Sequence, residues 1–482
     1  MTYDLLIIGG GINGAAIARE AVLNGLSVLL VEKNDLASAT SSSSTKLIHG
    51  GLRYLEYYDF KLVREALIER ERLLKAAPHL IHPLTFILPH ENRLRPWLMV
   101  RAGLFLYDHL GGRMSLAKSR GLRADDWLYR APLKGRGRGF VYSDAWVDDS
   151  RLVILNARDA ADNGAEIATR SAVTAADRGP DGWRATLSDG RSVDARMIVN
   201  AAGPWVPEVN RLLGAHASAG ARLIKGSHII TRKLFEGDQA YILQQPDRRI
   251  VFAIPYRDHF TLIGTTDIPV QKPQDAVIDE GEIDYLLRSV NSHFTRQASR
   301  ADIVSSYSGV RSLYDDGASE ARQVTRDYVL ELEDSAAPLL GIFGGKITTA
   351  RQLGEDALAK IGPALGRRVA PVTRARIFPG GDIAHFDDFV GRAQARWHFL
   401  GPERTLRMAR AYGTMLEAVI GDARDAEGLG EDFGGGLTER EVEWLVAREW
   451  AVTAEDILWR RTRLGLETGP ETATRLQAWL DQ

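Results

Sequence analysis

A glycine-rich turn between a short apolar strand and a helix constrains the fold of this 482-residue chain more than any other feature. An apolar strand is predicted over residues 4–8, and three glycines with the spacing G-x-G-x-x-G follow it directly: Gly9, Gly11 and Gly14. Residues 15–24 have helical character, and a second apolar strand over residues 26–31 ends at Glu32. A strand–helix–strand unit of this kind is typical of the Rossmann dinucleotide-binding fold. The sequence therefore predicts an α/β protein that binds a dinucleotide.

Each residue of the turn has a physical role in holding a pyrophosphate. Gly9 permits the tight turn, Gly11 lets the backbone approach the phosphates, and Gly14 lets the helix pack against the strand. Free N–H groups at the start of the helix, beside Asn13, face the phosphates. Glu32 is placed to accept a hydrogen bond from a ribose 2′-hydroxyl, and its charge disfavours the 2′-phosphate of NADP. The motif alone does not separate NAD from FAD.

Composition excludes several classes of function. The chain has 61 Lys and Arg against 63 Asp and Glu, whereas a dedicated nucleic-acid-binding protein is expected to be basic. It has no Cys, which excludes disulfides, thiolate metal sites, iron–sulfur clusters and a cysteinyl flavin link. Histidines are few and scattered, so no metal site is predicted. No apolar run reaches the roughly 18 residues of a membrane-spanning helix, and the N-terminus is not expected to be a signal peptide.

A hydroxyl-rich segment after the second strand points to a flavin. Residues 34–46 read N-D-L-A-S-A-T-S-S-S-S-T-K, with four consecutive serines flanked by threonines. Such a run is also compatible with a plain flexible linker. An ordered-looking stretch, residues 47–54, follows it at once, however. A loop rich in hydroxyls and glycines at this place suits the ribityl chain and the pyrophosphate of a flavin.

The run of residues 39–55 closely resembles the FAD-dependent glycerol-3-phosphate dehydrogenases of the respiratory, quinone-linked type. The similarity continues in the family's order and spacing through further runs, at residues 107–111, 142–144, 146–149, 200–206, 223–228, 263–267, 307–311, 343–349 and 458–462. Departures are small: Ala145 stands where a small residue or cysteine is expected, and Ser312 stands where proline is common. The resemblance covers essentially the whole chain and implies FAD as the cofactor.

The resemblance and the strand pattern together predict an α/β chain with several parts. A discontinuous Rossmann-type FAD-binding domain is expected from three segments, residues 1–75, 150–205 and 311–374. An antiparallel-sheet substrate domain is expected over residues 206–310. Residues 375–482 are expected to form a helical C-terminal domain, interpreted as a structural cap. Residues 76–149 are expected to be a basic insertion that faces the membrane.

The resemblance also implies a set of cofactor contacts. Besides the glycines of the first turn, Asn13 and Glu32, these belong to the hydroxyl-rich segment and the turn after it: Thr40, Ser41, Ser42, Ser44, Lys46, Leu47, His49, Gly50 and Gly51. The others lie in or after later strands: Val173, Ala202, Gly203, Gly345, Lys346 and Thr348. His49 is open to two interpretations, a covalent link to the flavin or, as preferred here, a supporting role through backbone bonds.

Oxidation of a secondary alcohol phosphate requires a base for the hydroxyl proton and cationic groups for the phosphate. The resemblance places five residues around the flavin ring: Arg53, Tyr54, His228, Arg311 and Lys346. Arg311 and Arg53 are assigned to the phosphate and the substrate oxygens, with Tyr54 in support. Arg326 is a weaker sixth candidate. His228 is the preferred base, because an ordinary histidine pKa of about 6.5 suits neutral pH, and Lys346 is the alternative.

A basic segment over residues 89–138 carries eleven Lys and Arg against four acidic residues. Apolar residues at 97–100 and 104–107 accompany these charges. Such a segment can lie on an anionic membrane surface, or it can form an ordinary helix that packs Leu104 and Phe105 inward. The resemblance favours peripheral membrane contact, a membrane quinone as the final oxidant, and a place at the cytoplasmic face of the inner membrane. A homo-oligomer is left open.

The leading hypothesis is therefore oxidation of sn-glycerol 3-phosphate to dihydroxyacetone phosphate, with FAD as the first electron acceptor. The nearest alternative is an amine or amino-acid oxidase of the same broad flavoprotein class, which requires a carboxylate clamp and no phosphate site. A third interpretation is a flavin-bearing RNA-binding protein that uses the basic segment. The balanced total charge disfavours this third class.

Overall fold

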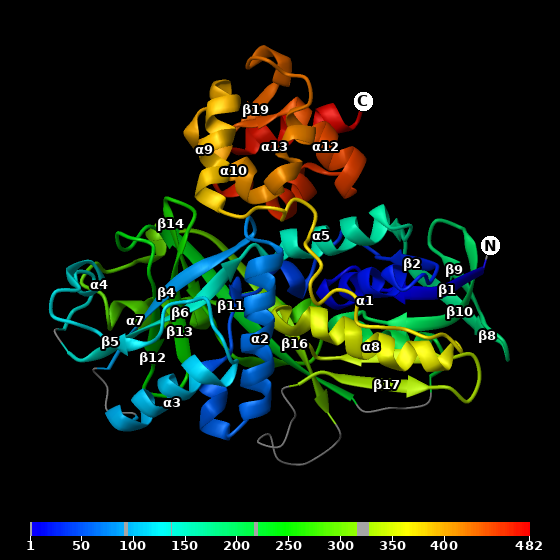
Figure 1. The fold of residues 1–482 in the computed structure, drawn as a ribbon, viewed down its shortest axis with the longest axis horizontal. Coiled ribbons are helices and arrows are strands. Elements are labelled where there is room, and N and C mark those ends of the chain that lie inside the picture. Colours follow the sequence, from blue (N-terminus) through cyan, green and yellow to red (C-terminus); the bar gives the residue numbers. More distant parts are fainter. Residues whose placement is uncertain (1, 91–94, 136, 216–219, 316–326) are drawn as a thin grey trace.

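Two β-sheets, each covered by helices, make up the body of the protein, and a mostly helical C-terminal domain lies on one side of it (Figure 1). The computed structural model describes residues 2–90, 95–135, 137–215, 220–315 and 327–482. The predicted fold class is confirmed. The chain is α/β, with a Rossmann-type domain, a largely antiparallel second sheet and a helical C-terminal domain.

The first sheet contains the strand–turn–helix unit predicted from the glycine motif. Its strands lie in the order β17, β18, β10, β1, β2 and β7, and the hairpin β8–β9 is added to β10. Their bounds are β1 Thr2–Ile8, β2 Val28–Val31, β7 Glu166–Ala168, β8 Val173–Arg178, β9 Trp183–Leu187, β10 Ser192–Asn200, β17 Val329–Glu333 and β18 Leu339–Phe343. β1 pairs in parallel with β2 and β10. Central parallel strands are covered on both faces, which explains the unbroken apolar run at residues 5–8.

Three helices pack over one face of the first sheet: α1 Ile12–Leu23, α5 Asp149–Asp162 and α8 Ala350–Ala364. α1 lies between the other two and contacts both (Figure 1). The backbones of α1 and α8 lie close together, because a Cβ atom on Gly354 of α8 would lie 3.0 Å from the carbonyl oxygen of Ala16 in α1. This packing fixes the position of α1, whose first turn carries the glycine motif.

The second sheet has the strand order β15, β11, β14, β13, β12, β4, β6 and β3, with β16 paired to β11 and β5 paired to β6. The bounds are β3 Leu47–Ile48, β4 Ile81–Pro89, β5 Arg120–Gly121, β6 Gly139–Val147, β11 Gly220–Arg232, β12 Ala240–Gln244, β13 Ile250–Tyr256, β14 Phe260–Gly264, β15 Ile268–Val270 and β16 Ile303–Asp315. Paired strands are antiparallel except β4 and β12, which run parallel. Alternate residues of these strands belong to two separate cores, one on each face of the sheet.

The expected domain limits stay a prediction, but residues 76–149 are not a separate insertion. β4 pairs with β6 along its whole length and also with β12, so both strands are integral to the second sheet. β16 likewise crosses the expected boundary at residue 310 and pairs with β11 almost end to end. These pairings join segments far apart in the chain. A division based on local charge therefore did not anticipate them.

The remaining helices flank the two sheets or form the C-terminal domain. Beside the second sheet lie α2 Phe60–Ala76, α3 Trp97–Leu110, α4 Trp127–Arg130 and α7 Glu280–Asn291, whereas α6 Val206–Leu212 packs mainly against β8, β10 and β18 of the first sheet. The C-terminal domain contains α9 Phe386–Arg396, α10 Pro402–Tyr412, α11 Leu416–Ile420, α12 Glu439–Glu449, α13 Pro470–Leu480 and the small hairpin of β19 Asp432–Gly434 and β20 Leu437–Thr438. Thr453 and Asp456 cap each other at the start of a helical turn: the hydroxyl of Thr453 accepts a hydrogen bond from the N–H of Asp456 at 3.2 Å, and the carboxylate of Asp456 accepts one from the N–H of Thr453 at 2.9 Å.

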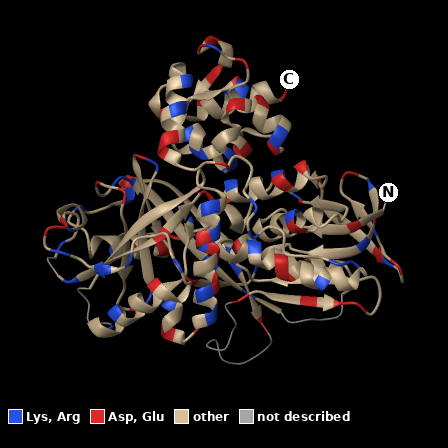
Figure 2. Cartoon of the chain, viewed as in Figure 1, with Lys and Arg blue, Asp and Glu red and all other residues tan. Residues whose placement is uncertain are grey.

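Ion pairs attach the C-terminal domain to the body. Basic and acidic positions lie together where the two parts meet (Figure 2). Pairs that cross this boundary include Arg461–Asp35, Arg460–Asp35, Arg170–Asp456, Arg151–Glu449, Arg257–Glu467 and Arg463–Asp149. Most of these side chains are buried, although the domain has its own apolar core. The domain is therefore bound by specific charged contacts and not by an apolar surface alone.

The two sheets are joined through a buried ion pair between α8 and α2, and its loss should destabilise the fold. Nε and Nη2 of Arg351 each donate to the carboxylate of Glu69 at 2.6 Å, and both side chains are almost fully buried. Removing one partner of a buried pair leaves an uncompensated charge and costs about 3–5 kcal/mol. We expect Arg351→Met to lower the free energy of unfolding by this amount, as measured by urea denaturation.

A matched control is Arg184→Met, which removes an arginine from a solvent-exposed pair with Asp194 at 2.8 Å. Exposed pairs of this kind contribute less than about 1 kcal/mol. An equal decrease in the free energy of unfolding in the two variants would show that burial of the Arg351–Glu69 pair does not contribute to stability.

Candidate active site

The first glycine turn closes against the end of β10. Gly9 has φ +116°, and a Cβ atom there would lie 2.6 Å from the carbonyl oxygen of Ala201. A Cβ atom on Gly14 would lie 2.0 Å from the carbonyl oxygen of Gly9. Both positions therefore require glycine. The backbone of the turn is open to a close approach by a ligand, as the motif predicts.

The start of α1 is held by the hydroxyl loop, defined here as residues 39–46. Oγ of Ser41 accepts a hydrogen bond from the N–H of Ile12 at 3.0 Å, and a Cβ atom on Gly11 would lie 3.1 Å from the same oxygen. The N–H groups of the first helical turn are therefore brought next to a serine-rich backbone. Oriented N–H groups at a helix start attract phosphate.

Glu32 lies buried at the end of β2 and braces the glycine turn. One carboxylate oxygen accepts from the N–H of Gly10 at 2.7 Å, and the other accepts from the N–H of Asn34 at 2.9 Å. Burial raises the pKa of the Glu32 carboxyl above its usual range, and the two N–H donors oppose part of this change. A carboxylate has about four acceptor positions. Capacity for a ribose hydroxyl therefore remains. Val173 begins β8 two residues after Ser171, whose N–H donates to the backbone of Glu32.

Two further turns close the site around the first one. The turn after β10 contains Ala202 and Gly203, and a Cβ atom on Gly9 would lie 3.1 Å from Cα of Ala202. After β18, Gly345 has φ +98°, and a Cβ atom there would lie 2.8 Å from the side chain of Asn13. Asn13 donates to the carbonyl oxygen of Gly344 at 3.0 Å.

The side-chain oxygen of Asn13 is buried and has no hydrogen-bond partner among the described residues. A buried acceptor without a donor costs about 1–3 kcal/mol, which a ligand donor at this place would recover. This acceptor, the three converging turns and the helix start form a donor and acceptor set that fits a dinucleotide. The residues present are therefore compatible with the FAD implied by the resemblance.

The side chains of the hydroxyl loop donate hydrogen bonds within the protein, and their expected contacts with the cofactor stay a prediction. Thr40 donates to the carbonyl oxygen of Val310 at 2.7 Å, and Ser42 donates to that of Ala39 at 3.2 Å. Ser44 donates to the carboxylate of Asp149 at 2.7 Å. These bonds fix the shape of the loop, and the Ser41 hydroxyl holds it against the start of α1.

Lys46 is an internal anchor of this loop. Its ammonium donates to both carboxylate oxygens of Asp149 at 2.9 Å and to the carbonyl oxygen of Ser42 at 3.0 Å. An ammonium has three donors, and all three are used here. Burial, together with the nearby Arg463 guanidinium, lowers the pKa of Lys46 to about 8. Lys46 therefore supports the loop, and the structure does not place it as a phosphate contact.

The turn after β3 places His49 beside Thr348. The N–H of His49 donates to Oγ1 of Thr348 at 3.3 Å. The ring of His49 meets Phe252 edge to face at 6.5 Å between ring centroids, and burial lowers the pKa of His49. The backbone N–H bond fits the supporting role preferred from the sequence. Leu47, two residues earlier, is buried in the core of the second sheet.

Gly50 and Gly51 shape the end of this turn. The N–H of Gly50 donates to the hydroxyl of Tyr107 at 2.7 Å, and Tyr107 donates to the buried Asp144 at 2.8 Å. Gly51 has φ +71°, which favours glycine. Nη1 of Arg70 completes the network, since it donates to Asp144 at 2.6 Å.

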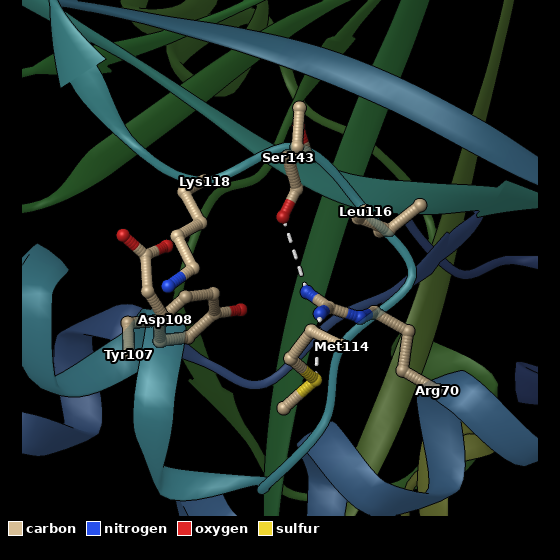
Figure 3. A pocket seen from close by; sticks show the side chains of 8 residues that line it. Arg70, Tyr107, Asp108, Met114, Leu116, Lys118 and Ser143 are labelled. Atoms are coloured by element: carbon tan, nitrogen blue, oxygen red, sulfur yellow. Dashed lines mark hydrogen bonds between the residues drawn. The ribbon is translucent and has the colours of Figure 1, made fainter.

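A narrow pocket lies behind this network (Figure 3). The guanidinium of Arg70 lies between the carbonyl oxygen of Ser143, at 3.1 Å, and the sulfur of Met114, at 3.5 Å (Figure 3). The pocket has room for about one water molecule. It is therefore too small for a substrate, and its side chains support the turn at Gly50.

One face of the β11–β16 pair faces the hydroxyl loop. His228 lies opposite Tyr307, Gly226 lies opposite Gly309, and Arg311 follows two residues after Gly309. Directly opposed residues share a face, and alternate residues along a strand share it too. A Cβ atom on Gly309 would lie 3.0 Å from Cβ of Ser43, so this is the face toward the loop. The two glycines let neighbouring groups approach this face closely, since a Cβ atom on Gly226 would lie 2.6 Å from Oγ1 of Thr265. In the strand register, the rings of His228 and Tyr307 lie on one side of the glycine pair and Arg311 lies on the other.

His228 is a buried, neutral imidazole. Its Nε2 lies 2.9 Å from Oγ1 of Thr45, its ring stacks on Tyr307 at 4.8 Å between centroids, and its Nδ1 has no partner among the described residues. Burial, and then the nearby Lys46 ammonium, lower the pKa of His228 to about 3. The argument from an ordinary histidine pKa is therefore wrong. The side chain is neutral at every physiological pH because the fold removes it from water.

Of the other expected substrate residues, Lys346 and Tyr54 contact each other, and Arg311 lies apart from them on β16. Nζ of Lys346 lies 4.1 Å from the ring centroid of Tyr54, a cation–π contact. Arg53 is nearby in the chain, and its buried Nε has no hydrogen-bond partner in the described part of the molecule. Arg311 is half-exposed and donates to Asp267 at 2.9 Å. Arg326 lies outside the described residues.

Sequence reasoning missed the residues that hold these groups. Thr45 and Tyr307 orient His228, Asp267 holds Arg311, and Asp149 anchors the hydroxyl loop. All four lie inside the runs that carry the resemblance, but nothing in those runs shows which groups they contact. Over the described ranges, no cluster of three His, Asp or Glu side chains is arranged to hold a metal ion.

Comparison with known proteins agrees with this geometry. Residues 4–351 match the family described as FAD dependent oxidoreductase, and residues 371–481 match the C-terminal domain of alpha-glycerophosphate oxidase. A glycerol-3-phosphate dehydrogenase of Pseudomonas aeruginosa is 50% identical over 488 residues, which span 99% of this chain and 95% of that protein. A D-erythritol 1-phosphate dehydrogenase of Brucella abortus is 47% identical over 491 residues, which span 100% and 98%.

A solved structure extends the likeness to the whole fold. The glycerol-3-phosphate dehydrogenase of Bacillus halodurans, complexed with FAD, has a TM-score of 0.76 at 26% identity and covers 100% of this chain and 94% of its own. The matched family spans most of the chain and depends on FAD. The chain therefore belongs to the FAD-dependent oxidoreductases, in the family of the glycerol-3-phosphate dehydrogenases.

Proposed function

We propose that this protein oxidises sn-glycerol 3-phosphate to dihydroxyacetone phosphate and passes the electrons to a membrane quinone. The observation that carries the proposal is the shared face of β11 and β16, where His228 and Arg311 lie on either side of the glycine pair Gly226 and Gly309. The names of relatives at about half identity support the same substrate class, a polyol phosphate. FAD supplies the acceptor for the hydride removed from C2 of the substrate.

Arg311 is the proposed phosphate ligand. A guanidinium has five N–H donors, and the ion pair with Asp267 uses only part of this set. The side chain is half-exposed, so a charged substrate reaches it without the cost of opening a buried pair. Its fork also matches two phosphate oxygens at once, which a lysine does not. Asp267 then serves to hold Arg311 in place.

His228 is the proposed base for the hydroxyl proton. The oxidation releases one proton from the C2 hydroxyl, while the C2 hydrogen leaves with its electron pair. For Nδ1 of His228 to accept this proton, Nε2 must carry the hydrogen and donate it to Oγ1 of Thr45. The lowered pKa favours the neutral form, which is the form able to accept a proton. Lys346, held on the ring of Tyr54, is the competing group.

The Arg311 assignment predicts selectivity for phosphorylated substrates. Wild-type protein should oxidise glycerol 3-phosphate far faster than glycerol or glycine, as measured by steady-state rates with a soluble quinone analogue. Arg311→Lys keeps the charge but loses the fork. It should therefore lower kcat/KM for glycerol 3-phosphate by about 10- to 150-fold, the equivalent of a charged hydrogen bond of about 1.5–3 kcal/mol. FAD content should stay unchanged.

Arg300→Lys is the matched control, because Arg300 is equally exposed and also bound to a carboxylate, that of Asp284 at 2.6 Å. It should retain wild-type kinetics. Equal effects of the two substitutions, or wild-type oxidation of glycine in place of glycerol 3-phosphate, would contradict the phosphate site. The second result would favour the amino-acid oxidase alternative.

The pKa of His228 leads to a prediction about pH. A pKa of about 3 leaves the imidazole fully neutral between pH 5 and 8. The anaerobic rate of flavin reduction should therefore show no inflection near pH 6.5 that depends on this residue. His228→Asn should slow reduction by about 10²–10⁴-fold at every pH, the usual effect of losing a positioned base. Stopped-flow absorbance measures both quantities.

Lys346→Met is the comparison for this experiment. It should slow flavin reduction less than His228→Asn does. The assignment is wrong if the lysine variant loses as much rate as the histidine variant, or if wild-type protein shows an inflection near pH 6.5 that disappears in His228→Asn.

Peripheral contact with the cytoplasmic face of the inner membrane is the second part of the proposal, and α3 supports it. Leu98, Met99, Phe105 and Leu106 lie on one side of this helix and are exposed, Leu98 by 78% and Phe105 by 56%. Leu104 is buried, so the simple inward-packing alternative holds for Leu104 and is wrong for Phe105. α3 lies at the edge of the body away from the C-terminal domain (Figure 1).

The surroundings of α3 carry positive charge. Arg113 and Lys118 are exposed just after the helix, and an exposed apolar face beside basic residues is typical of a helix that lies in the membrane interface. No helix in the described ranges is long and apolar enough to cross a membrane. The proposed contact is therefore made from the surface, where a quinone in the bilayer is accessible.

Two substitutions test the membrane contact. Leu98→Glu combined with Phe105→Glu should lower binding to vesicles of anionic lipid at least about tenfold in a co-sedimentation assay, because each exposed apolar side chain is worth more than 1 kcal/mol when it enters the bilayer. Val446→Glu on α12, at another exposed apolar position, is the control and should bind as the wild type does. Unchanged binding by the double variant would remove α3 from the proposal.

A further inference from the structure

The C-terminal domain reaches the interior of the cofactor domain through Arg463. This residue follows Thr462 in a left-handed conformation, φ +60°, which turns the chain toward the body. Its Nη2 donates to the carboxylate of Asp149 at 2.6 Å and lies 2.8 Å from Oγ of Ser150. The Arg463 side chain is largely buried, and Asp149 is completely buried. No other ion pair between the two parts meets the hydroxyl loop's anchor in the described structure.

Asp149 is the same carboxylate that anchors the hydroxyl loop. It accepts from the ammonium of Lys46 at 2.9 Å and from both the N–H and the hydroxyl of Ser44, at 3.1 and 2.7 Å. Two cations, Lys46 and Arg463, therefore neutralise the buried carboxylate of Asp149. The carboxylate of Asp148 also lies near, 3.6 Å from Nη2 of Arg463. If Arg463 is removed, two carboxylates at the start of α5 face Lys46 alone, and a space opens behind the loop.

The loop in turn holds the proposed base. Tyr307 donates to the carbonyl oxygen of Ser44 at 2.8 Å and stacks on His228, and Thr45 bonds Nε2 of His228. The ammonium of Lys46 also lies 5.0 Å from the ring centroid of Tyr307. An unbroken series of contacts thus runs from Arg463 through Asp149 and the loop to the imidazole.

We propose that Arg463 is a positioning residue, through which the C-terminal domain holds the hydroxyl loop and His228 in the shape that binds FAD. The domain then has a function beyond that of a structural cap, because cofactor affinity depends on its docking. The inference rests on the FAD dependence of the family and on the assignment of residues 39–46 to the cofactor site. It does not depend on the identity of the substrate or of the electron acceptor.

The competing explanation is that Arg463 merely attaches the domain. Arg257 provides the matched comparison, since it also joins the body to the C-terminal domain. It pairs with Glu467, with Nη2 donating at 2.9 Å, and it contacts the carbonyl oxygen of Thr462. Within the described residues, Arg257 makes no hydrogen bond to the hydroxyl loop or to Asp149, so Arg257→Met weakens docking without altering the anchor.

The experiment compares Arg463→Met and Arg257→Met in the full chain. FAD affinity is measured by titrating apoprotein with FAD and following flavin fluorescence, and the visible spectrum of each loaded protein is recorded. We expect Arg463→Met to raise the dissociation constant for FAD at least about tenfold and to change the flavin spectrum, because a charged bond to the loop's anchor is lost. Arg257→Met should change the dissociation constant less than about twofold and leave the spectrum unaltered.

Arg463→Lys separates positioning from misfolding. It keeps the charge but not the fork, so it should recover part of the affinity lost in Arg463→Met while its circular dichroism stays that of the wild type. If Arg463→Met does not fold, Arg463→Lys takes its place and should still bind FAD more weakly than Arg257→Met does. The proposal would be overturned if the Arg463 variants bound FAD with unchanged affinity, or if Arg463→Met and Arg257→Met lost FAD affinity equally. Failure of glycerol 3-phosphate as a substrate would not affect these results.

Discussion

The buried carboxylate of Asp149 is the interaction on which the rest of the site depends. A charge with no access to water must be compensated inside the protein, and here Lys46 and Ser44 of the hydroxyl loop and Arg463 of the C-terminal domain contact it from two distant parts of the chain. These bonds fix the hydroxyl loop against the glycine turn at the start of α1. Ser41 on this loop accepts from the first helical N–H. Cofactor site, substrate face and C-terminal domain are thereby connected through one anchor.

The substrate face follows from the same arrangement. Because Gly309 packs against Ser43, β16 approaches the loop closely enough to bury His228 and to cover part of Tyr307. That burial makes the imidazole neutral, and it leaves Arg311 at the solvent-exposed end of the same face. An uncharged base and an exposed cation on either side of a glycine pair suit a substrate with a hydroxyl at one end and a phosphate at the other. The order of these groups follows from the strand register.

The sequence predicted the parts of the fold that have local causes. Glycine is required at positions 9 and 14 because a Cβ atom there would clash with a neighbouring backbone oxygen. The apolar run at residues 5–8 results from burial on both faces of a parallel strand. Long-range pairing was not visible in the same way. The recruitment of β4 and β6 into the second sheet and the inward direction of Lys46 depend on partners over 50 residues away. The pKa of His228 was misjudged because its burial comes from Tyr307 and the hydroxyl loop.

The central claim is that the arrangement around His228 and Arg311 serves the oxidation of a polyol phosphate by bound FAD. The most direct test is the visible absorption spectrum of the purified protein under anaerobic conditions. The account predicts a yellow protein whose flavin absorption is bleached within the mixing time of an added excess of glycerol 3-phosphate, and is not bleached by glycerol or by amino acids. A colourless protein that binds no FAD, or a flavin bleached by an amino acid and not by glycerol 3-phosphate, would contradict it.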